Sequence, residues 1–282
     1  MIGFMNNFIR LENSNLLVLV DVNYGGKIVK LINKDNGSNW VWFNDSKYSK
    51  YSPTEFSDYD SQWIGGYEEL YPNDKVELIN GKQAPDHGEL WSSSWEIINN
   101  TAKSLEIKCE GYFSNSMIIK KFEIIGNKLL VNCEIKEIKF KNYLFKLHLA
   151  LPVNRHSVEF GFKSFKKVDH QFGNIVQDDN LNDFLTSINA DEGRNDFVYF
   201  YGIDSEIKIF DQNNNVCILE YDKETLPYFW IFQSRGGWNN LNVNVLEPCN
   251  SGLKDIQTAV KNNLIYIPKD NNFHTWYTIE LI

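Results

Sequence analysis

The feature that most constrains this chain is an alternation of apolar and polar residues, repeated in short runs. Within Lys128–Lys136 every second side chain from Leu129 to Ile135 is apolar, and Asn132 and Glu134 lie between them. Successive side chains of a β-strand point to opposite faces, so such a run has one apolar and one polar face. This pattern is typical of an antiparallel strand with only one face buried.

Gly126 and Asn127 separate this run from Met117–Ile125, and the two runs together predict a tight hairpin. Similar runs recur along the chain with turn residues between them: Leu16–Val22, Ser104–Phe113, Phe197–Tyr201, Glu206–Phe210, Val216–Tyr221, Tyr228–Phe232, Asn242–Glu247 and Phe273–Ile282. No window keeps a helical period over three turns, so at most a few short helices are expected, with residues 181–188 as a candidate. The sequence therefore predicts an all-β, antiparallel sandwich with few short helices, in a single domain over residues 1–282.

The charge and the cysteines exclude several classes of function. With 37 acidic and 28 basic residues the net charge is −9, which gives no general attraction to nucleic acid or to an anionic membrane. No segment approaches the roughly 20 apolar residues of a membrane span, and the first ten residues do not resemble a signal peptide. A cytoplasmic protein is therefore expected. The four cysteines are scattered without a CxxC pair, so neither a zinc site nor a disulfide framework is predicted.

Three consecutive segments do not fit a plain sandwich: Tyr48–Asp60, Gln62–Asn73 and Asp74–Trp95. They are irregular and rich in aromatic residues, Gly and Pro. Long loops in a compact domain are usually functional or disordered, and the aromatic content argues against disorder. We therefore expect the functional site to involve these loops.

The segment 84–95 (APDHGELWSSSW) contains the first candidate, His87. Asp86 and Glu89 flank it, and Trp91 offers an aromatic face that suits the apolar side of a sugar ring. A metal site formed by Asp86, His87 and Glu89 is an alternative, although the segment lacks the spacing of a helical His-x-x-x-His motif.

The second candidate, His148, lies in the strand-like segment Asn142–Val153. One face of this strand is apolar and consists of Phe145, Leu147, Leu149 and Leu151. Lys146 and His148 therefore belong to the opposite face. From the alternation alone, His148 faces either solvent or a polar neighbour.

The third candidate is Glu247, which shares its face of a strand with Leu241, Val243 and Val245. Pro248 follows and cannot continue the hydrogen-bonded ladder. A carboxylate beside an apolar row has its pKa raised by desolvation, which favours a role as a general base. The alternative is an ordinary Glu at a strand end that pairs with a cation such as Arg235.

Taken in order, four segments resemble the galactose mutarotase superfamily, and in particular the aldose 1-epimerases. They are Gly65–Asn73 (GGYEELYPN), Asp86–Glu89 followed by Trp95, the strand that carries His148, and Glu247–Cys249 (EPC). The resemblance implies a twisted antiparallel β-supersandwich with a sugar cleft on one concave face. It also implies catalysis without a cofactor or a metal, on a small-molecule sugar, by a monomer or homodimer.

The resemblance further assigns roles to individual residues. Glu247 would take the proton from the anomeric hydroxyl, His148 would protonate the ring oxygen, and His87 would hold the sugar in place. Further sugar-binding residues are expected at five positions: Asp86, Glu69, Asn73, Trp91 and Arg235. The Asp that binds a sugar hydroxyl is left open among Asp178, Asp179 and Asp204.

Several departures from the family pattern leave the activity open. Asn80 has no adjacent Arg, and His148 is followed by Leu-Ala-Leu-Pro rather than Pro-Tyr-Phe-Asn. Only four arginines are present, which favours a neutral sugar, while Arg235 beside two glycines leaves a sugar 6-phosphate open. A non-catalytic sugar-binding protein and a glycosidase that uses Glu69 with Glu247 are also compatible with the sequence.

Overall fold

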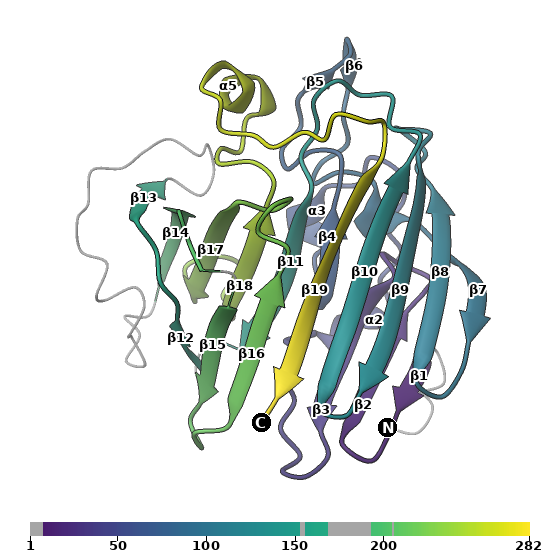
Figure 1. Cartoon of the computed structure of the whole chain (residues 1–282), viewed down its shortest axis with the longest axis vertical. Helices are drawn as coiled ribbons and strands as arrows, with labels where there is room; N and C mark the ends of the chain where they lie inside the picture. The colour runs from purple at the N-terminus through teal and green to yellow at the C-terminus, as the bar shows by residue number, and fades with distance from the viewer. Residues whose placement is uncertain (1–7, 153–155, 169–192, 205) are drawn as a thin grey trace.

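The computed structural model describes residues 8–152, 156–168, 193–204 and 206–282. Two large antiparallel sheets lie face to face (Figure 1). The nine-stranded sheet has the order β1 (Ile9–Glu12), β2 (Leu16–Asp21), β3 (Lys27–Asn33), β4 (Tyr67–Leu70), β11 (Lys146–Pro152), β18 (Asn242–Cys249), β17 (Tyr228–Arg235), β14 (Arg194–Tyr201) and β13 (Ser164–Val168).

The eight-stranded sheet has the order β12 (His156–Glu159), β15 (Glu206–Asp211), β16 (Val216–Tyr221), β19 (Phe273–Leu281), β10 (Lys128–Lys136), β9 (Met117–Ile125), β8 (Ser104–Glu110) and β7 (Glu96–Asn100). The predicted hairpin is confirmed, since Ile125 of β9 pairs with Lys128 of β10 around Gly126 and Asn127. Gly126 has a φ of 61°, a conformation that glycine adopts without strain.

Helices are few and short, as predicted: α2 (Asp45–Tyr48), α3 (Tyr59–Gln62), α5 (Ile256–Lys261) and the 3₁₀ turn η1 (Leu90–Ser92). The helix expected near residues 181–188 lies outside the described residues. Within the described part of the chain, no helix combines the length and the apolar character needed to cross a bilayer. A small hairpin, β5 (Leu78–Ile79) with β6 (Lys82–Gln83), lies at the same end of the molecule as α5 (Figure 1).

The main hydrophobic core lies between the two sheets and uses the alternation seen in the sequence. Leu147 and Leu149 of β11 belong to the same buried cluster as Phe122 of β9 and Val131 of β10. The other face of the nine-stranded sheet is buried too, because the loop segments between β3 and β7 cover it. A second cluster there joins Tyr59 and Trp63 to Val243 and Val245 of β18. β11 is therefore buried on both faces, and its polar side chains lie under the loops.

A buried ion pair connects the two sheets. Lys120 of β9 lies 2.6 Å from Glu69 of β4, and its ammonium group also donates to the carbonyl oxygens of Gly25 and Gly26. The Tyr277 hydroxyl donates to the other Glu69 oxygen at 3.1 Å. Glu69 pairs in register with Leu147, so it shares the face that packs between the sheets. The predicted sugar-binding residue Glu69 is thus placed in the core.

We expect Glu69→Gln to lower the free energy of unfolding by about 3 kcal/mol, because removing one partner leaves the Lys120 charge buried without a counterion. The double variant Glu69→Leu with Lys120→Met removes both charges and should regain most of this loss. Urea unfolding of the three proteins measures the difference. Equal stability of Glu69→Gln and the parent protein would contradict this placement of the ion pair.

Candidate functional site

Three neighbouring strands place a row of ionisable side chains on the outer face of the nine-stranded sheet. β11 pairs with β4 on one side, where His148 lies opposite Glu68. On its other side Leu149 pairs with Leu246 of β18, so the register places His148 opposite Glu247. Nδ1 of His148 lies 3.9 Å from Glu68 Oε1, and Nε2 lies 4.0 Å from Glu247 Oε1. A buried histidine is therefore flanked by one carboxylate on each side.

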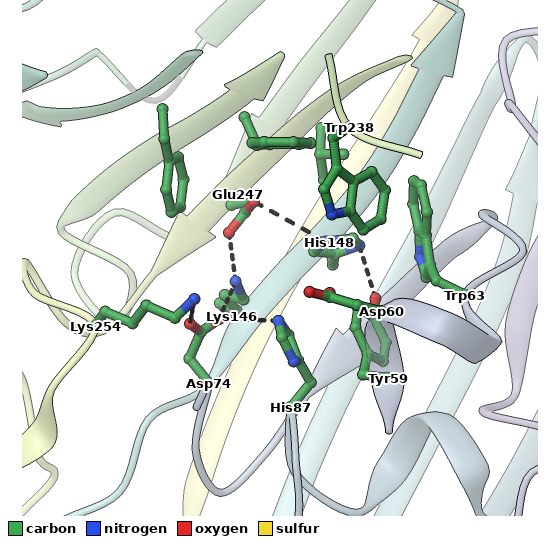
Figure 2. A pocket seen from close by; sticks show the side chains of 13 residues that line it. Tyr59, Asp60, Trp63, Asp74, His87, Lys146, His148, Trp238, Glu247 and Lys254 are labelled. Atoms are coloured by element: carbon green, nitrogen blue, oxygen red, sulfur yellow. Dashed lines mark hydrogen bonds and ion pairs between the residues drawn. The ribbon is translucent and has the colours of Figure 1, made fainter. Parts of the chain in front are cut away.

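The row opens into a cavity. In Figure 2, Trp63 and Trp238 lie on one side of it, and Lys254 and Asp74 lie on the other. The cavity is lined by Tyr59, Asp60, Trp63, Asp74, His87, Lys146, His148, Phe197, Phe232, Trp238, Val245, Glu247 and Lys254. An aromatic wall beside charged and hydroxyl-bonding groups matches the apolar face and polar rim of a sugar ring.

Lys146 binds two carboxylates at the floor of this cavity (Figure 2). Its Nζ lies 2.5 Å from Glu247 Oε2 and forms an ion pair with Asp74 Oδ1. The second oxygen of Asp74 forms an ion pair with Lys254 at 3.2 Å. Lys146 also lies over the ring of Trp230, 5.1 Å from its centroid. The ammonium group is therefore fixed by a strand, a loop and an aromatic face.

These contacts set the charge states of the two acids in opposite ways. Burial raises the pKa of Glu247, and Lys146 opposes this only in part. Burial also acts to raise the pKa of Asp74, but Lys146 and Lys254 together hold it well below its usual range. Asp74 therefore remains a carboxylate, whereas Glu247 is the acid of the pair with the greater readiness to accept a proton.

His87 reaches the cavity from the loop that precedes η1. Its Nδ1 lies 2.9 Å from Asp86 Oδ1, and its Nε2 lies 4.0 Å from Asp74 Oδ1. Its ring stacks on Tyr59 with centroids 4.1 Å apart. The backbone turns sharply here, with positive φ at His87 and Gly88, and a Cβ on Gly88 would lie 2.1 Å from the Tyr71 carbonyl oxygen. Only glycine fits at position 88.

Tyr59 and Glu68 lie behind His148. The Tyr59 hydroxyl donates to Glu68 Oε1 at 2.7 Å and lies 3.3 Å from His148 Nδ1. The other Glu68 oxygen lies 2.6 Å from the fully buried Lys27. Burial lowers the pKa of His148 well below its usual range, and the charges of Lys146 and His87 act in the same direction. The free protein therefore holds His148 as a neutral imidazole.

The three predicted catalytic residues, Glu247, His148 and His87, all line the same cavity. The alternation of β11 and β18 that the sequence shows is confirmed, because Leu147 and Leu149 pack between the sheets while His148 and Glu247 lie on the other face. The alternative in which Glu247 pairs with a nearby cation holds, but that cation is Lys146 and not the suggested Arg235.

The predicted sugar-binding residues mostly lie behind the cavity wall. Asp86 holds His87 and accepts the backbone N–H of Tyr59 at 2.9 Å. Asn73 donates to the carbonyl oxygens of Lys75 and Pro85, so it fixes the loop.

Trp91 is buried and donates to the Asp86 carbonyl oxygen at 3.0 Å. Arg235 is buried beside Gln233, to which it donates. Neither side chain lines the cavity.

Several lining residues were not predicted from the sequence: Tyr59, Asp60, Asp74, Lys146 and Lys254. Lys146 carried a usable signal, because it shares its face of the strand with His148. Asp74 directly follows the Pro-Asn pair of the recognised segment, which also marks it. Tyr59 and Lys254 lie in a short helix and a loop, where no periodicity indicates which way a side chain points.

The metal site and the open Asp position receive no support at this cavity. The Glu89 carboxylate accepts the backbone N–H groups of Phe113 and Ser114 at 2.6 and 3.3 Å, so it does not join Asp86 and His87 in a metal site. Across the described ranges, no group of three or more His, Cys, Asp or Glu side chains could hold a metal ion. Of the three Asp candidates, residues 178 and 179 lie outside the described residues, and Asp204 does not line the cavity.

Of the comparisons with known proteins, the comparison of structures found matches and the two sequence comparisons did not. No protein-family model and no curated protein matches the sequence. A solved structure from Synechocystis sp. PCC 6803 aligns with a TM-score of 0.72 and 12% identity, covering 97% of this chain and 95% of that one. The GalM/aldose epimerase homologue from C. elegans aligns with a TM-score of 0.68 and 13% identity, covering 98% of both chains.

A galactose mutarotase-like protein from Lactobacillus casei ATCC 334 aligns with a TM-score of 0.67 and 14% identity, covering 98% of this chain and all of that one. The chain therefore has the galactose mutarotase-like fold over nearly its whole length, as its sequence segments predict. At such low identities the fold alone is shared, and the function has to be argued from the cavity.

Gly88→Ala tests how tight the turn that presents His87 is. Gly81 is a matched control, because its φ of 77° is close to the 73° of Gly88 and a Cβ there meets nothing within 4 Å. We expect Gly81→Ala to lose about 1 kcal/mol of unfolding free energy through the left-handed conformation alone. Gly88→Ala should lose clearly more, because the added Cβ clashes with backbone. Equal losses in thermal or urea unfolding would contradict the close contact with Tyr71.

Proposed function

We propose that this protein is an aldose 1-epimerase that interconverts the α and β anomers of an uncharged aldose. The observation that carries the proposal is the pairing of Glu247 and His148 at one cavity, with Oε1 and Nε2 4.0 Å apart. A base and an acid on the same side of a sugar ring can act on the anomeric hydroxyl and on the ring oxygen. Trp63 and Trp238 supply apolar faces for the ring.

In the proposed reaction Glu247 takes the proton of the anomeric hydroxyl while protonated His148 gives a proton to the ring oxygen. The bond between C1 and the ring oxygen breaks, and an open-chain aldehyde forms. Rotation about the C1–C2 bond turns the other face of the aldehyde toward the hydroxyl, and the reverse proton transfers close the ring. His148 first takes up one proton from solvent, and after that step atoms and charges balance within the sugar and these two side chains. His87, held by Asp86, positions a sugar hydroxyl.

Lys146 supports this role of Glu247. A carboxylate buried in this position would be protonated near neutral pH if it lacked a counterion. Lys146 lies 2.5 Å from one Glu247 oxygen and leaves the other directed toward His148. The ion pair therefore favours the ionised form of the base and orients it, while burial keeps its pKa raised and suited to accept a proton.

The charges around the cavity favour a neutral sugar over a sugar phosphate. Among the described residues that line it, Lys146 and Lys254 face three acids, Asp60, Asp74 and Glu247. Both lysines are already paired with Asp74. A phosphate would thus meet an excess of negative charge. The four cysteines are buried and free, which agrees with the cytoplasmic location that forms part of this proposal.

Polarimetry on freshly dissolved α-D-glucose and α-D-galactose tests the proposal. We expect the protein to accelerate mutarotation and Glu247→Gln to reduce kcat by about 100-fold or more, since each proton transfer of this kind is worth about 10² to 10⁴ in rate. Glu123→Gln, at a partly exposed position on β9, is the matched control and should keep full activity. Sugar binding without acceleration, across common aldoses, would instead identify a non-catalytic sugar-binding protein.

Lys146→Met should move the acidic limb of the pH–rate profile to higher pH. Burial already raises the pKa of Glu247, and loss of the Lys146 charge removes the main group that opposes it. Because the base works only when ionised, activity will then appear only at higher pH than in the parent protein. Profiles of kcat/KM for variants shown to be folded by circular dichroism measure the shift. An unmoved acidic limb would contradict the role of Lys146.

A further inference from the structure

We infer that Tyr59 fixes the proton of neutral His148 on Nδ1, so that Nε2 is the nitrogen that exchanges protons with the sugar. Tyr59 and Glu68 are then positioning residues, whose hydroxyl and carboxylate groups act through His148. The inference deepens the proposed epimerase reaction and rests on it for its catalytic consequence. The position of the proton itself stands on the hydrogen bonds alone.

The first step concerns the single proton of the Tyr59 hydroxyl. Two groups lie near this oxygen: Glu68 Oε1 at 2.7 Å and His148 Nδ1 at 3.3 Å. An ionised carboxylate can only accept, and Lys27 lies 2.6 Å from its other oxygen. The shorter contact to the charged acceptor therefore takes the proton of Tyr59.

The second step follows for the imidazole. With its proton directed to Glu68, Tyr59 can only accept from His148, so Nδ1 of His148 must carry a hydrogen. Glu68 Oε1 lies 3.9 Å from the same nitrogen, which adds a favourable charge on that side. The neutral ring has only one N–H group, and Nε2 is consequently bare.

The third step concerns the cavity side of His148. Its bare Nε2 lies 4.0 Å from Glu247 Oε1, so two proton acceptors face the space where the sugar reacts. A bare nitrogen cannot protonate a ring oxygen. The site must therefore take up one proton on Nε2 before the ring opens, which gives an imidazolium. Ring closure returns this proton to Nε2, and Nδ1 keeps its hydrogen through the whole cycle.

The charges around His148 show why this support is needed. Lys146 on its own strand and His87 on the covering loop oppose a positive ring, as does Lys27 behind Glu68. Glu247 on β18, Asp74 on its loop, and Glu68 on β4 favour it.

Tyr59 carries the effect of Glu68 to Nδ1 through two hydrogen bonds. Its ring also stacks on His87, so one residue from α3 orients both histidines.

Nitrogen-15 NMR of the imidazole groups tests the inference directly. At a pH where His148 is neutral, we expect the parent protein to show a protonated Nδ1 and an unprotonated Nε2. In Tyr59→Phe the acceptor is lost while the ring that stacks on His87 is kept, and the Nε2–H form should become populated. A parent protein with its proton on Nε2 would overturn the inference. This readout needs no substrate, so it stands apart from any failure of the proposed epimerase activity.

Tyr51→Phe is the matched control. Tyr51 is also buried, and its hydroxyl lies 3.5 Å from Lys27. This variant should leave the His148 resonances unchanged.

In kinetics, Tyr59→Phe should lower kcat by about tenfold or more with little change in KM, because it removes the hydroxyl beside the imidazole and keeps the ring that lines the cavity. Equal kcat values for the two variants would contradict the role of Tyr59. If Tyr59→Phe does not fold, the tautomer of the parent protein still decides.

Discussion

Lys146 is the buried cation on which the arrangement of this cavity depends. It stands on a central strand and contacts Glu247 on the neighbouring strand and Asp74 on a loop that crosses above them. Asp74 in turn contacts Lys254, which begins the segment before α5. Buried charges are tolerated only when they are paired. Lys146 therefore holds the strand of Glu247 and the loop of Asp74 close to its own strand, and through Asp74 also the segment before α5. The loops over the sheet are positioned by charge as much as by their aromatic packing.

In β4, two adjacent glutamates contribute to different parts of the structure: one to the core and one to the candidate site. Glu68 and Glu69 are adjacent, so their side chains point to opposite faces. Glu69 pairs with Lys120 between the sheets, while Glu68 pairs with Lys27 beneath the covering loops. Each carboxylate has its own buried lysine. The first pair links the two sheets. In the second pair, the other Glu68 oxygen faces Nδ1 of His148.

The sequence predicted the parts of this structure that depend on alternation. In the strands of His148 and Glu247, the alternation of apolar residues correctly predicts which face each side chain occupies. The fold follows from the same alternation along the chain. Glu69 was expected to bind the sugar because the family resemblance covers the whole segment Gly65–Asn73. That resemblance does not distinguish the two faces of β4. The roles of Tyr59, Asp74 and Lys254 arise from how loops cross the sheet. Those paths depend on long-range ion pairs and stacking, which leave no local periodic signal.

The row of ionisable groups lies on strands, whereas part of the cavity wall comes from connecting segments. Glu68, His148 and Glu247 stand side by side on three hydrogen-bonded strands in the middle of a nine-stranded sheet. Trp63, Trp238 and Lys254, which border the space for a ligand, come from connecting segments. Sheet residues diverge slowly because neighbours on both sides constrain them, whereas connecting segments accept replacement and insertion. Under the proposed function, a lineage with this architecture can therefore change the sugars it admits by replacing its loops, while the three strands keep the same reaction from one substrate to the next.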